Sequence, residues 1–243
     1  MLPILFITFG FGIIGFIDDF RKLVLKNTEG LKPIYKMLGL LFISVIYVLY
    51  LEKFIGLGTD ILIPIINIRI LLPIWIYIPF AIFVILATTN AINLTDGIDG
   101  LAASVTAIIV TCLTVISIIY DVKEMTVYGS IVIGSCIGFL LFNLHTAKVF
   151  MGDTGSLLLG GIIAAMALYL KNPLLLILIA IVPIIETLSV MLQVAYFKKT
   201  GKRILKMAPL HHHFELSGWR ESKVVTVFGM ITLIACILGI LIA

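Results

Sequence analysis

The chain has 243 residues and a net charge of +4; 61% of its residues are hydrophobic, 12% are charged, and the mean hydropathy is +1.23. Soluble domains normally carry about 25% charged residues, so this composition excludes an ordinary soluble fold. Eight membrane helices of about 20 residues would occupy about 160 residues, which leaves room for loops but not for a separate soluble domain.

Apolar runs follow one another along the chain and predict an all-α, polytopic bundle of about eight transmembrane helices, a single domain over residues 1–243. The runs cover residues 1–17, 37–51, 74–89, 98–120, 126–144, 156–170, 173–197 and 224–243. The first run lacks a basic leading segment and ends at Asp18-Asp19, which is not typical of a cleavable signal peptide. Pro183 predicts a kink in the seventh run.

The long loop 52–73 contains a β-rich stretch, residues 61–70, which is interrupted by Pro64. This pattern predicts either a short β-hairpin or a re-entrant piece on the outer, periplasmic side.

Basic residues are divided unequally between the two sets of loops. The richer set comprises 18–36, 90–99, 145–155 and 198–223; the poorer set comprises 52–73, 121–125 and 171–172. The richer set holds 13 Lys and Arg residues and the poorer set holds four. By the positive-inside rule, the richer side is expected to face the cytoplasm, with both termini outside.

The first polar motif, Asp18-Asp19-Phe20-Arg21-Lys22, follows the first run directly. Adjacent carboxylates at a helix end need a balancing cation, and Lys22 lies one helical turn beyond Asp19. The motif is either a solvated helix end or a site that binds Mg²⁺ or positions a phosphate.

The second motif runs from Asn93 to Gly100 and contains Asp96-Gly97-Ile98-Asp99. Glycine after each carboxylate allows the backbone to approach a ligand closely. The motif is either a tight polar turn or a loop whose carboxylates bind a metal or accept hydrogen bonds from a base or sugar.

The third motif begins at Asn143 and continues through Phe150-Met151-Gly152-Asp153-Thr154-Gly155-Ser156 into the sixth run. Asp153 is either a helix N-cap or a Mg²⁺ ligand, and the free N–H groups of the helix N-terminus would suit a phosphate. Phe150 is either an apolar contact or a platform on which a base stacks.

The fourth motif, His211-His212-His213, lies in the longest cytoplasmic segment. Consecutive helical side chains diverge by about 100°, so the triplet cannot surround one metal ion. It is either a surface cluster or a source of general acid–base and phosphate contacts. Glu186 and Gln193, seven residues apart on the seventh run, should face protein or a cavity rather than lipid.

Taken together, four stretches in this order resemble the phospho-N-acetylmuramoyl-pentapeptide transferases, a branch of the polyprenyl-phosphate N-acetylhexosamine-1-phosphate transferase superfamily. They are Asp18-Asp19-x-x-Lys22, Asn93-x-x-Asp96-Gly97-x-Asp99-Gly100-Leu101, residues 150–156, and Pro209-Leu210-His211-His212-His213-Phe214-Glu215. The resemblance implies a Mg²⁺-dependent enzyme of the bacterial plasma membrane, with its active site on the cytoplasmic face. Its substrates would be UDP-MurNAc-pentapeptide and undecaprenyl phosphate, with lipid I and UMP as products, and no nucleic-acid partner is expected.

The resemblance also implies residue roles. Asp153 is expected to bind Mg²⁺, Asp18 to act as base or to position the lipid phosphate, and Asp19 and Lys22 to support the phosphates. On the nucleotide side the expected residues are Asn93, Asp96, Gly97, Ile98 and Asp99, with Phe150 stacking on uracil and Asp99 accepting from its imide. Asn143, Gly152, Ser156 and Gln193 would complete the substrate pocket, and His211, His212 and His213 would contact the sugar-phosphate or diphosphate.

Family members typically have ten spans, so the chain is expected to lack the first two and the cytoplasmic loop that follows them. That loop usually brings a basic residue and a hydroxyl residue to the nucleotide or sugar. A homodimer is a further family-based expectation. The remaining alternatives are a GlcNAc-1-phosphate transferase, against which the triple-histidine run argues, and a membrane transporter.

Overall fold

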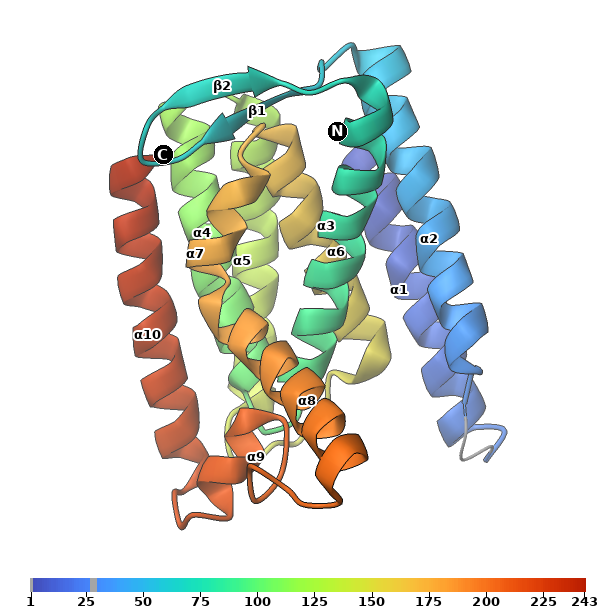
Figure 1. Ribbon diagram of the computed structural model, residues 1–243, viewed down its shortest axis with the longest axis vertical. Coiled ribbons are helices and arrows are strands. Elements are labelled where there is room, and N and C mark those ends of the chain that lie inside the picture. Colours follow the sequence, from blue (N-terminus) through green and yellow to red (C-terminus); the bar gives the residue numbers. More distant parts are fainter. Residues whose placement is uncertain (1, 27–29) are drawn as a thin grey trace.

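The computed structural model describes residues 2–26 and 30–243 and consists of upright helices with one small sheet (Figure 1). The first half contains α1 (Leu2–Leu23), α2 (Pro33–Tyr50) extended by η1 (Leu51–Ile55), β1 (Asp60–Ile63), β2 (Ile68–Leu71) and α3 (Ile74–Thr95). The second half contains α4 (Leu101–Ile119), α5 (Lys123–Asn143), α6 (Gly152–Tyr169), η2 (Pro173–Leu175), α7 (Leu176–Ile179), α8 (Ile181–Thr200), α9 (Leu210–Glu215) and α10 (Glu221–Ile242).

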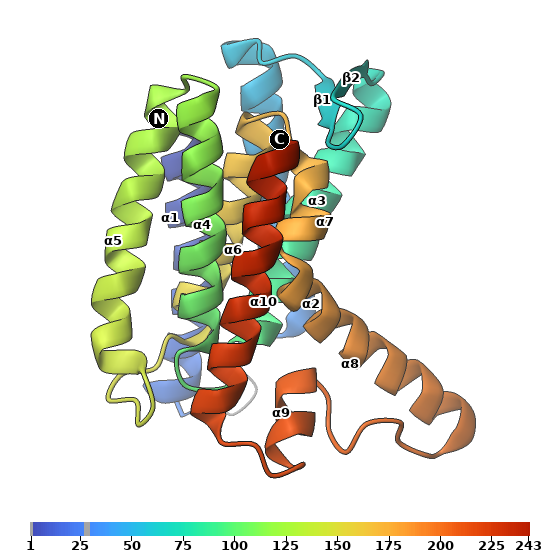
Figure 2. The same cartoon turned by 90° about the vertical axis from the view of Figure 1, so that its left-hand side faces the viewer.

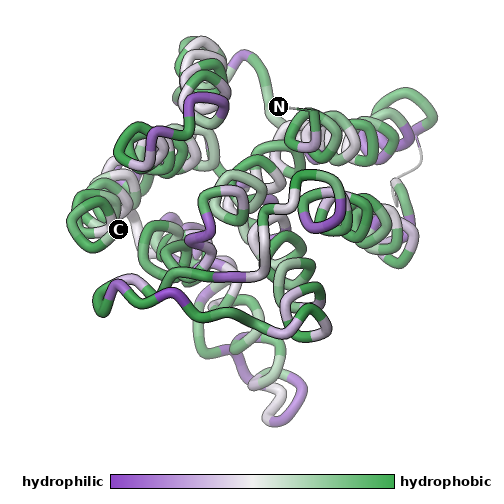
Figure 3. Tube along the Cα trace, turned by 90° about the horizontal axis from the view of Figure 1, so that it is seen from above, coloured by the Kyte–Doolittle hydropathy of each residue, from purple (hydrophilic) through white to green (hydrophobic). Residues whose placement is uncertain are grey.

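Within this described part, eight helices are long and apolar enough to cross a membrane, which confirms the predicted all-α polytopic class. Large apolar side chains such as Phe9, Ile131 and Leu241 are exposed on their outer faces. Seen from above, hydrophobic residues dominate most of the helix circumferences (Figure 3). Helices that are apolar all round require either a protein core or lipid around them.

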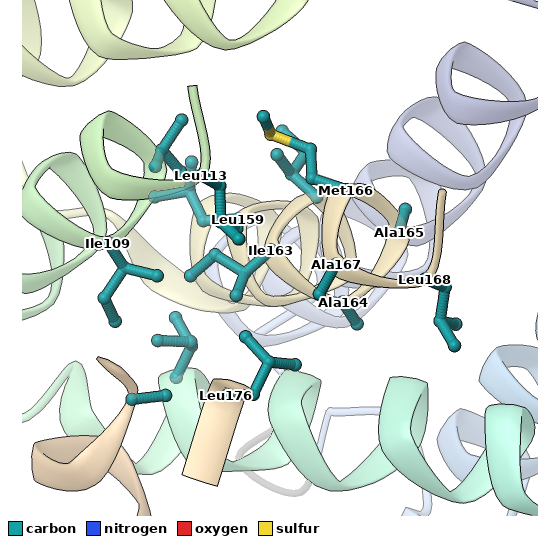
Figure 4. Packing of buried hydrophobic residues seen from close by; sticks show 14 of the residues in the cluster. Ile109, Leu113, Leu159, Ile163, Ala164, Ala165, Met166, Ala167, Leu168 and Leu176 are labelled. Carbon is teal, nitrogen blue, oxygen red and sulfur yellow. The ribbon is translucent and has the colours of Figure 1, made fainter. Parts of the chain in front are cut away.

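The most buried span is α6, which packs against α1, α3 and α4. Leu159 and Ile163 lie between Leu113 of α4 and Leu176 of α7 (Figure 4). Gly160 allows this close packing, because a Cβ there would lie 2.6 Å from the Cα of Thr89 on α3. The central position of α6 fixes its first turn, which carries Asp153, among the neighbouring helices.

The loop 52–73 forms the hairpin that was one of the two predicted alternatives. Strands β1 and β2 pair antiparallel, with Asp60 opposite Leu71 and Ile63 opposite Ile68. The Leu62 amide donates to the Lys171 carbonyl at 2.8 Å, and Asp60 pairs with the Lys171 ammonium. The hairpin therefore covers the turn after α6, at the same end of the bundle as both chain termini (Figure 1).

The predicted kink in the seventh span is a break at Ala180, which separates α7 from α8. Pro183 lies in the first turn of α8 and has no N–H to continue the helical hydrogen bonds back to Ile179. Beyond the break α8 leans out of the bundle, and the chain returns through α9 to α10 (Figure 2).

Several boundaries differ from the apolar runs because helical hydrogen bonding continues past the last apolar residue. Helix α1 extends to Leu23, so Asp18 and Asp19 lie inside its last two turns rather than after it. Helix α3 extends to Thr95 and includes Asn93. Both extensions bring polar side chains of the motifs onto rigid helices.

Candidate active site

Asp153, in the first turn of α6, is the centre of a cluster of polar side chains at the end of the bundle opposite the hairpin. Its Oδ1 accepts a hydrogen bond from Asn93 Nδ2 at 2.7 Å. Its Oδ2 lies 3.0 Å from Lys36 Nζ and 3.3 Å from Lys22 Nζ. Asn93 also donates to Ser156 Oγ at 2.8 Å. Helices α1, α2, α3 and α6 thus each contribute a side chain to one charged group.

Asp18 is buried, with only 2% of its side chain exposed. Its Oδ1 accepts from the Leu31 amide at 2.7 Å, and its Oδ2 pairs with Lys22, four residues later on the same helix. The predicted pairing of Lys22 with Asp19 is therefore wrong, because the i, i+4 spacing places the ammonium beside Asp18 instead.

Asp19 has a different task. It accepts hydrogen bonds from the Asp153 amide at 3.1 Å, the Thr154 amide at 2.8 Å and the Thr154 hydroxyl at 2.5 Å. The two amides belong to the first turn of α6 and have no acceptor within their own helix, so a carboxylate of α1 caps α6. The amides expected to suit a phosphate are thus already engaged by Asp19.

Glycines permit the close approach of α1 and α6. A Cβ on Gly15 would overlap the Asp153 carbonyl and lie 2.6 Å from the Cα of Thr154. Gly152 has φ +65°, and a Cβ there would lie 2.7 Å from Asp19 Oδ2. The carboxylates of the first and third motifs therefore meet because these positions lack side chains.

Asp18, Asp19 and Asp153 each offer an oxygen within 4.8 Å of the others. Carboxylate oxygens are the ligands that Mg²⁺ prefers, so the donor set fits a hard divalent cation. Lys22 and Lys36 place two positive charges beside Asp153.

A cavity of about 250 Å³ lies next to this cluster. It is lined by Asp96, Gly97, Ile98, Asp99, Asn143, Phe150, Met151 and Gly152. All of these except Met151 are residues predicted from the sequence to bind substrate. Phe150 is 76% exposed, so its side chain is accessible for stacking.

Hydrogen bonds hold two walls of the cavity together. Asn143 is buried; its Oδ1 accepts from the Gly100 amide at 3.1 Å, and its Nδ2 donates to the Val149 carbonyl at 2.9 Å. Asp99 accepts from the Ala147 amide at 2.9 Å. The loops after α3 and α5 are therefore fixed to each other.

Asp96, which lines the cavity, has a strongly shifted pKa. Burial, followed by repulsion from Asp153 and Asp19, raises its pKa to about 7, and the nearby His211 partly offsets the shift. A carboxyl group with a pKa near 7 is present in both its protonated and its ionised form around neutral pH.

The three histidines of α9 have separate partners, in keeping with their predicted divergence. His211 is fully buried with Nδ1 3.1 Å from Glu186 Oε2. His212 Nδ1 lies 2.6 Å from Glu215, and His213 Nδ1 accepts from the Lys206 amide at 3.1 Å. His211 thus faces the bundle, whereas His213 fixes the loop before α9.

Gln193 does not line the cavity. Its Oε1 accepts from the amides of Ile204 and Leu205, both at 3.0 Å, and its Nε2 donates to the Leu205 carbonyl at 3.1 Å. It closes the loop after α8 and borders an apolar groove of about 340 Å³.

Sequence reasoning missed Lys36 as a site residue and counted it only as a cytoplasmic charge. Its position at the start of an apolar run gave no indication of a contact with Asp153, 117 positions away. His145, which stands two residues after Asn143 in the third motif, was given no role from the sequence; its ring lies 3.6 Å from Asp99 and 3.3 Å from Glu221.

Comparison with known proteins agrees with these motifs. The family model described as glycosyl transferase family 4 matches residues 1–171. A phospho-N-acetylmuramoyl-pentapeptide-transferase from Acetivibrio thermocellus is 48% identical over 98% of this chain and 72% of its own length. Proteins of the same name from Caldicellulosiruptor bescii and Clostridium perfringens are 50% and 51% identical; the alignments cover 96% and 95% of this chain and 72% and 70% of those proteins.

Proposed function

Because the chain belongs to glycosyl transferase family 4 and, within it, to the phospho-N-acetylmuramoyl-pentapeptide transferases, we propose that the cluster around Asp153 is where it makes lipid I for peptidoglycan synthesis. The donor is a nucleotide sugar, UDP-MurNAc-pentapeptide, and the acceptor is a lipid phosphate, undecaprenyl phosphate. The site opens at the cytoplasmic face of a multi-pass bacterial membrane protein.

The reaction needs positioning and charge neutralisation more than activation of the nucleophile. An oxygen of the lipid phosphate attacks the sugar-linked phosphorus of the diphosphate; the bond from that phosphorus to the bridging oxygen breaks, and UMP leaves with the electron pair. Two anions must approach each other, so cations around them lower the barrier. Lys22 and Lys36 are suited to this task, because their ammonium groups already converge on Asp153.

The carboxylates are suited to hold Mg²⁺, which would neutralise the diphosphate and its leaving group. Asp153 is the proposed principal ligand, supported by its central position among α1, α2 and α3 side chains. Asp19 keeps the first turn of α6 in place, and Asp18 orients Lys22.

The cavity beside the cluster is proposed to hold the nucleotide. Phe150 offers an exposed ring for stacking on uracil, and Asp99 offers a carboxylate to its imide N–H. Asp96 lines that cavity within electrostatic reach of Asp153 and Asp19, and His211 lies against Gly97 of the same lining, which suits contact with the diphosphate or the sugar.

The observation that carries the proposal is the meeting of Asp18, Asp19 and Asp153 with two lysines beside the cavity. The test is UMP release from UDP-MurNAc-pentapeptide and undecaprenyl phosphate with and without Mg²⁺. We expect Mg²⁺-dependent release, reduced at least about 100-fold in Asp153→Asn. Asp121→Asn, an exposed substitution in the turn before α5, is the matched control and should retain activity.

Two results would contradict the proposal. Lipid-linked GlcNAc from UDP-GlcNAc as the sole product would show a different sugar specificity. Equal UMP release by Asp153→Asn and the unsubstituted protein would remove Asp153 from the centre of the reaction.

A further inference from the structure

Glu186 is a fully buried acidic side chain on a membrane-spanning helix, in the second turn of α8 after the break at Ala180. Ionisable groups inside a membrane helix are costly unless hydrogen bonds or an opposite charge compensate them. The partners of Glu186 therefore indicate why a carboxylate is present there.

Those partners come from the first two residues of α9. Glu186 Oε2 accepts from the Leu210 amide at 2.7 Å, Oε1 accepts from the His211 amide at 3.1 Å, and Oε2 lies 3.1 Å from His211 Nδ1. An ionised carboxylate can only accept hydrogen bonds. A neutral His211 ring must therefore carry its proton on Nδ1, which leaves the Nε2 lone pair as an acceptor.

The Nε2 atom points at Gly97, a residue that lines the nucleotide cavity. It is buried and has no hydrogen-bond partner among the described residues. A Cβ on Gly97 would overlap it, so the ring edge lies directly against the Asp96-Gly97 wall of the nucleotide cavity. A buried acceptor without a partner is costly, and a donor on a bound substrate would remove that cost.

We propose that Glu186 is a positioning residue that holds His211 in the Nδ1–H tautomer and directs Nε2 toward the donor substrate. This inference rests on the proposed function. In the transfer reaction, Nε2 accepts a hydrogen bond from a hydroxyl or amide N–H of the sugar, so it orients the sugar-phosphate relative to the attacking lipid phosphate. Glu186 does not touch the substrate and acts through the imidazole, as second-layer carboxylates do for other functional histidines.

A simpler role for Glu186 would be to cap α9 without any influence on the reaction. The two roles differ in their dependence on His211. If Glu186 acts through the imidazole, replacing it should reduce UMP release little further once His211 has been replaced. If Glu186 has an independent structural role, the two substitutions should reduce UMP release by the product of their separate factors.

The experiment combines a tautomer measurement with a double-mutant cycle on the full chain in detergent or nanodiscs. Nitrogen-15 NMR of histidine-labelled protein, with His211→Gln to assign the signal, reports which ring nitrogen carries the proton. UMP release is measured for Glu186→Gln, His211→Gln and the double variant. Thr187→Val is the matched control, because within the described ranges the Thr187 hydroxyl bonds only to the Pro183 carbonyl of its own helix.

We expect a single Nδ1–H tautomer in the unsubstituted protein and its loss in Glu186→Gln. The glutamine NH₂ group would face one of the three N–H groups that donate to the Glu186 carboxylate, and two donors cannot bond to each other. We expect kcat to fall about 100-fold in Glu186→Gln with KM changed less than about threefold, and the double variant to be no worse than His211→Gln. Thr187→Val should retain the tautomer and the rate.

An Nε2–H tautomer in the unsubstituted protein, or additive losses in the double variant, would overturn the inference. The NMR signal does not require turnover. Lack of UMP release by the unsubstituted protein, with an intact Nδ1–H signal, would count against the proposed function and not against the Glu186–His211 pair.

Discussion

At the scale of single residues, Asp18 and Asp19 are chain neighbours with different tasks, because successive helical side chains point in different directions. Asp18 turns into the protein and pairs with Lys22, whereas Asp19 reaches across to the N-terminus of α6. Because the cap of α6 comes from α1, Asp19 both accepts hydrogen bonds from the α6 amides and links the two helices.

Removal of this cap should loosen α6. We expect Asp19→Ala to lower the free energy of unfolding by about 1–2 kcal/mol, because the Asp153 and Thr154 amides lose their acceptor. Asp19→Asn keeps an acceptor and should lose less. Thermal unfolding in detergent measures both, and equal melting temperatures for Asp19→Ala and the unsubstituted protein would contradict the capping role.

Asp96 should make stability depend on pH. Its pKa of about 7 lies above the ordinary value, so the folded protein binds more protons than the unfolded chain between about pH 4 and pH 7. Stability contributed by the protonated form is therefore lost as pH rises through this window. We expect Asp96→Asn to raise the melting temperature more at pH 8 than at pH 5, with Asp121→Asn as the control; a gain independent of pH would contradict this assignment.

The chemistry of individual residues was more predictable than their partners. Residue type and motif spacing indicated Asp18, Asp99, Asp153 and His211 as site candidates, and the structure brings them to one end of the bundle. Lys36 and the Glu186–His211 pair depend on contacts between helices distant in sequence, which a single sequence does not encode locally. Gln193 shares a helix with Glu186, but its contacts depend on how the loop after α8 folds.

At the scale of elements, the hydropathy pattern predicted the spans and the hairpin because both follow from local periodicity and turn residues. The break at Ala180 and the polar extensions of α1 and α3 were not predicted by hydropathy, because they depend on backbone hydrogen bonding. The break at Ala180 precedes Pro183 by three residues, since the missing amide of a proline affects the preceding turn.

The contact of α1 with α6 offers a test at this scale. Gly15→Ala would place a methyl group against the Asp153 backbone, so the helices must separate and the carboxylates move apart. We expect a loss of about 1–3 kcal/mol in stability together with loss of UMP release. Gly134→Ala on α5, where a Cβ meets no atom within 4 Å, is the matched control and should be neutral or slightly stabilising. Normal activity in Gly15→Ala would contradict the dependence of the site on this approach.

At the scale of the whole molecule, the hairpin and the charged cluster lie at opposite ends of the helices (Figure 1). The hairpin end is held by Asp60, whose burial would raise its pKa but whose hydrogen bond and attraction to Lys171 lower it overall. The basic end carries the loops that the positive-inside rule assigns to the cytoplasm.

Cysteine labelling tests this orientation. Cys112, Cys136 and Cys236 are buried, so an introduced cysteine can report alone. We expect a membrane-impermeant maleimide to label Lys53→Cys in intact cells and Lys202→Cys only after permeabilisation, since these exposed positions lie at opposite ends. The reverse pattern would invert the proposed topology.

The two lysines that converge on Asp153 also set the net charge of the carboxylate cluster itself, apart from Asp96 and Asp99 of the neighbouring cavity. With Asp18, Asp19 and Asp153 ionised, three negative charges face two positive ones, which leaves a residual charge of one negative unit. Uptake of one divalent cation would turn that into one positive unit. The cluster alone therefore repels an anionic headgroup weakly and would attract one once a divalent cation is bound.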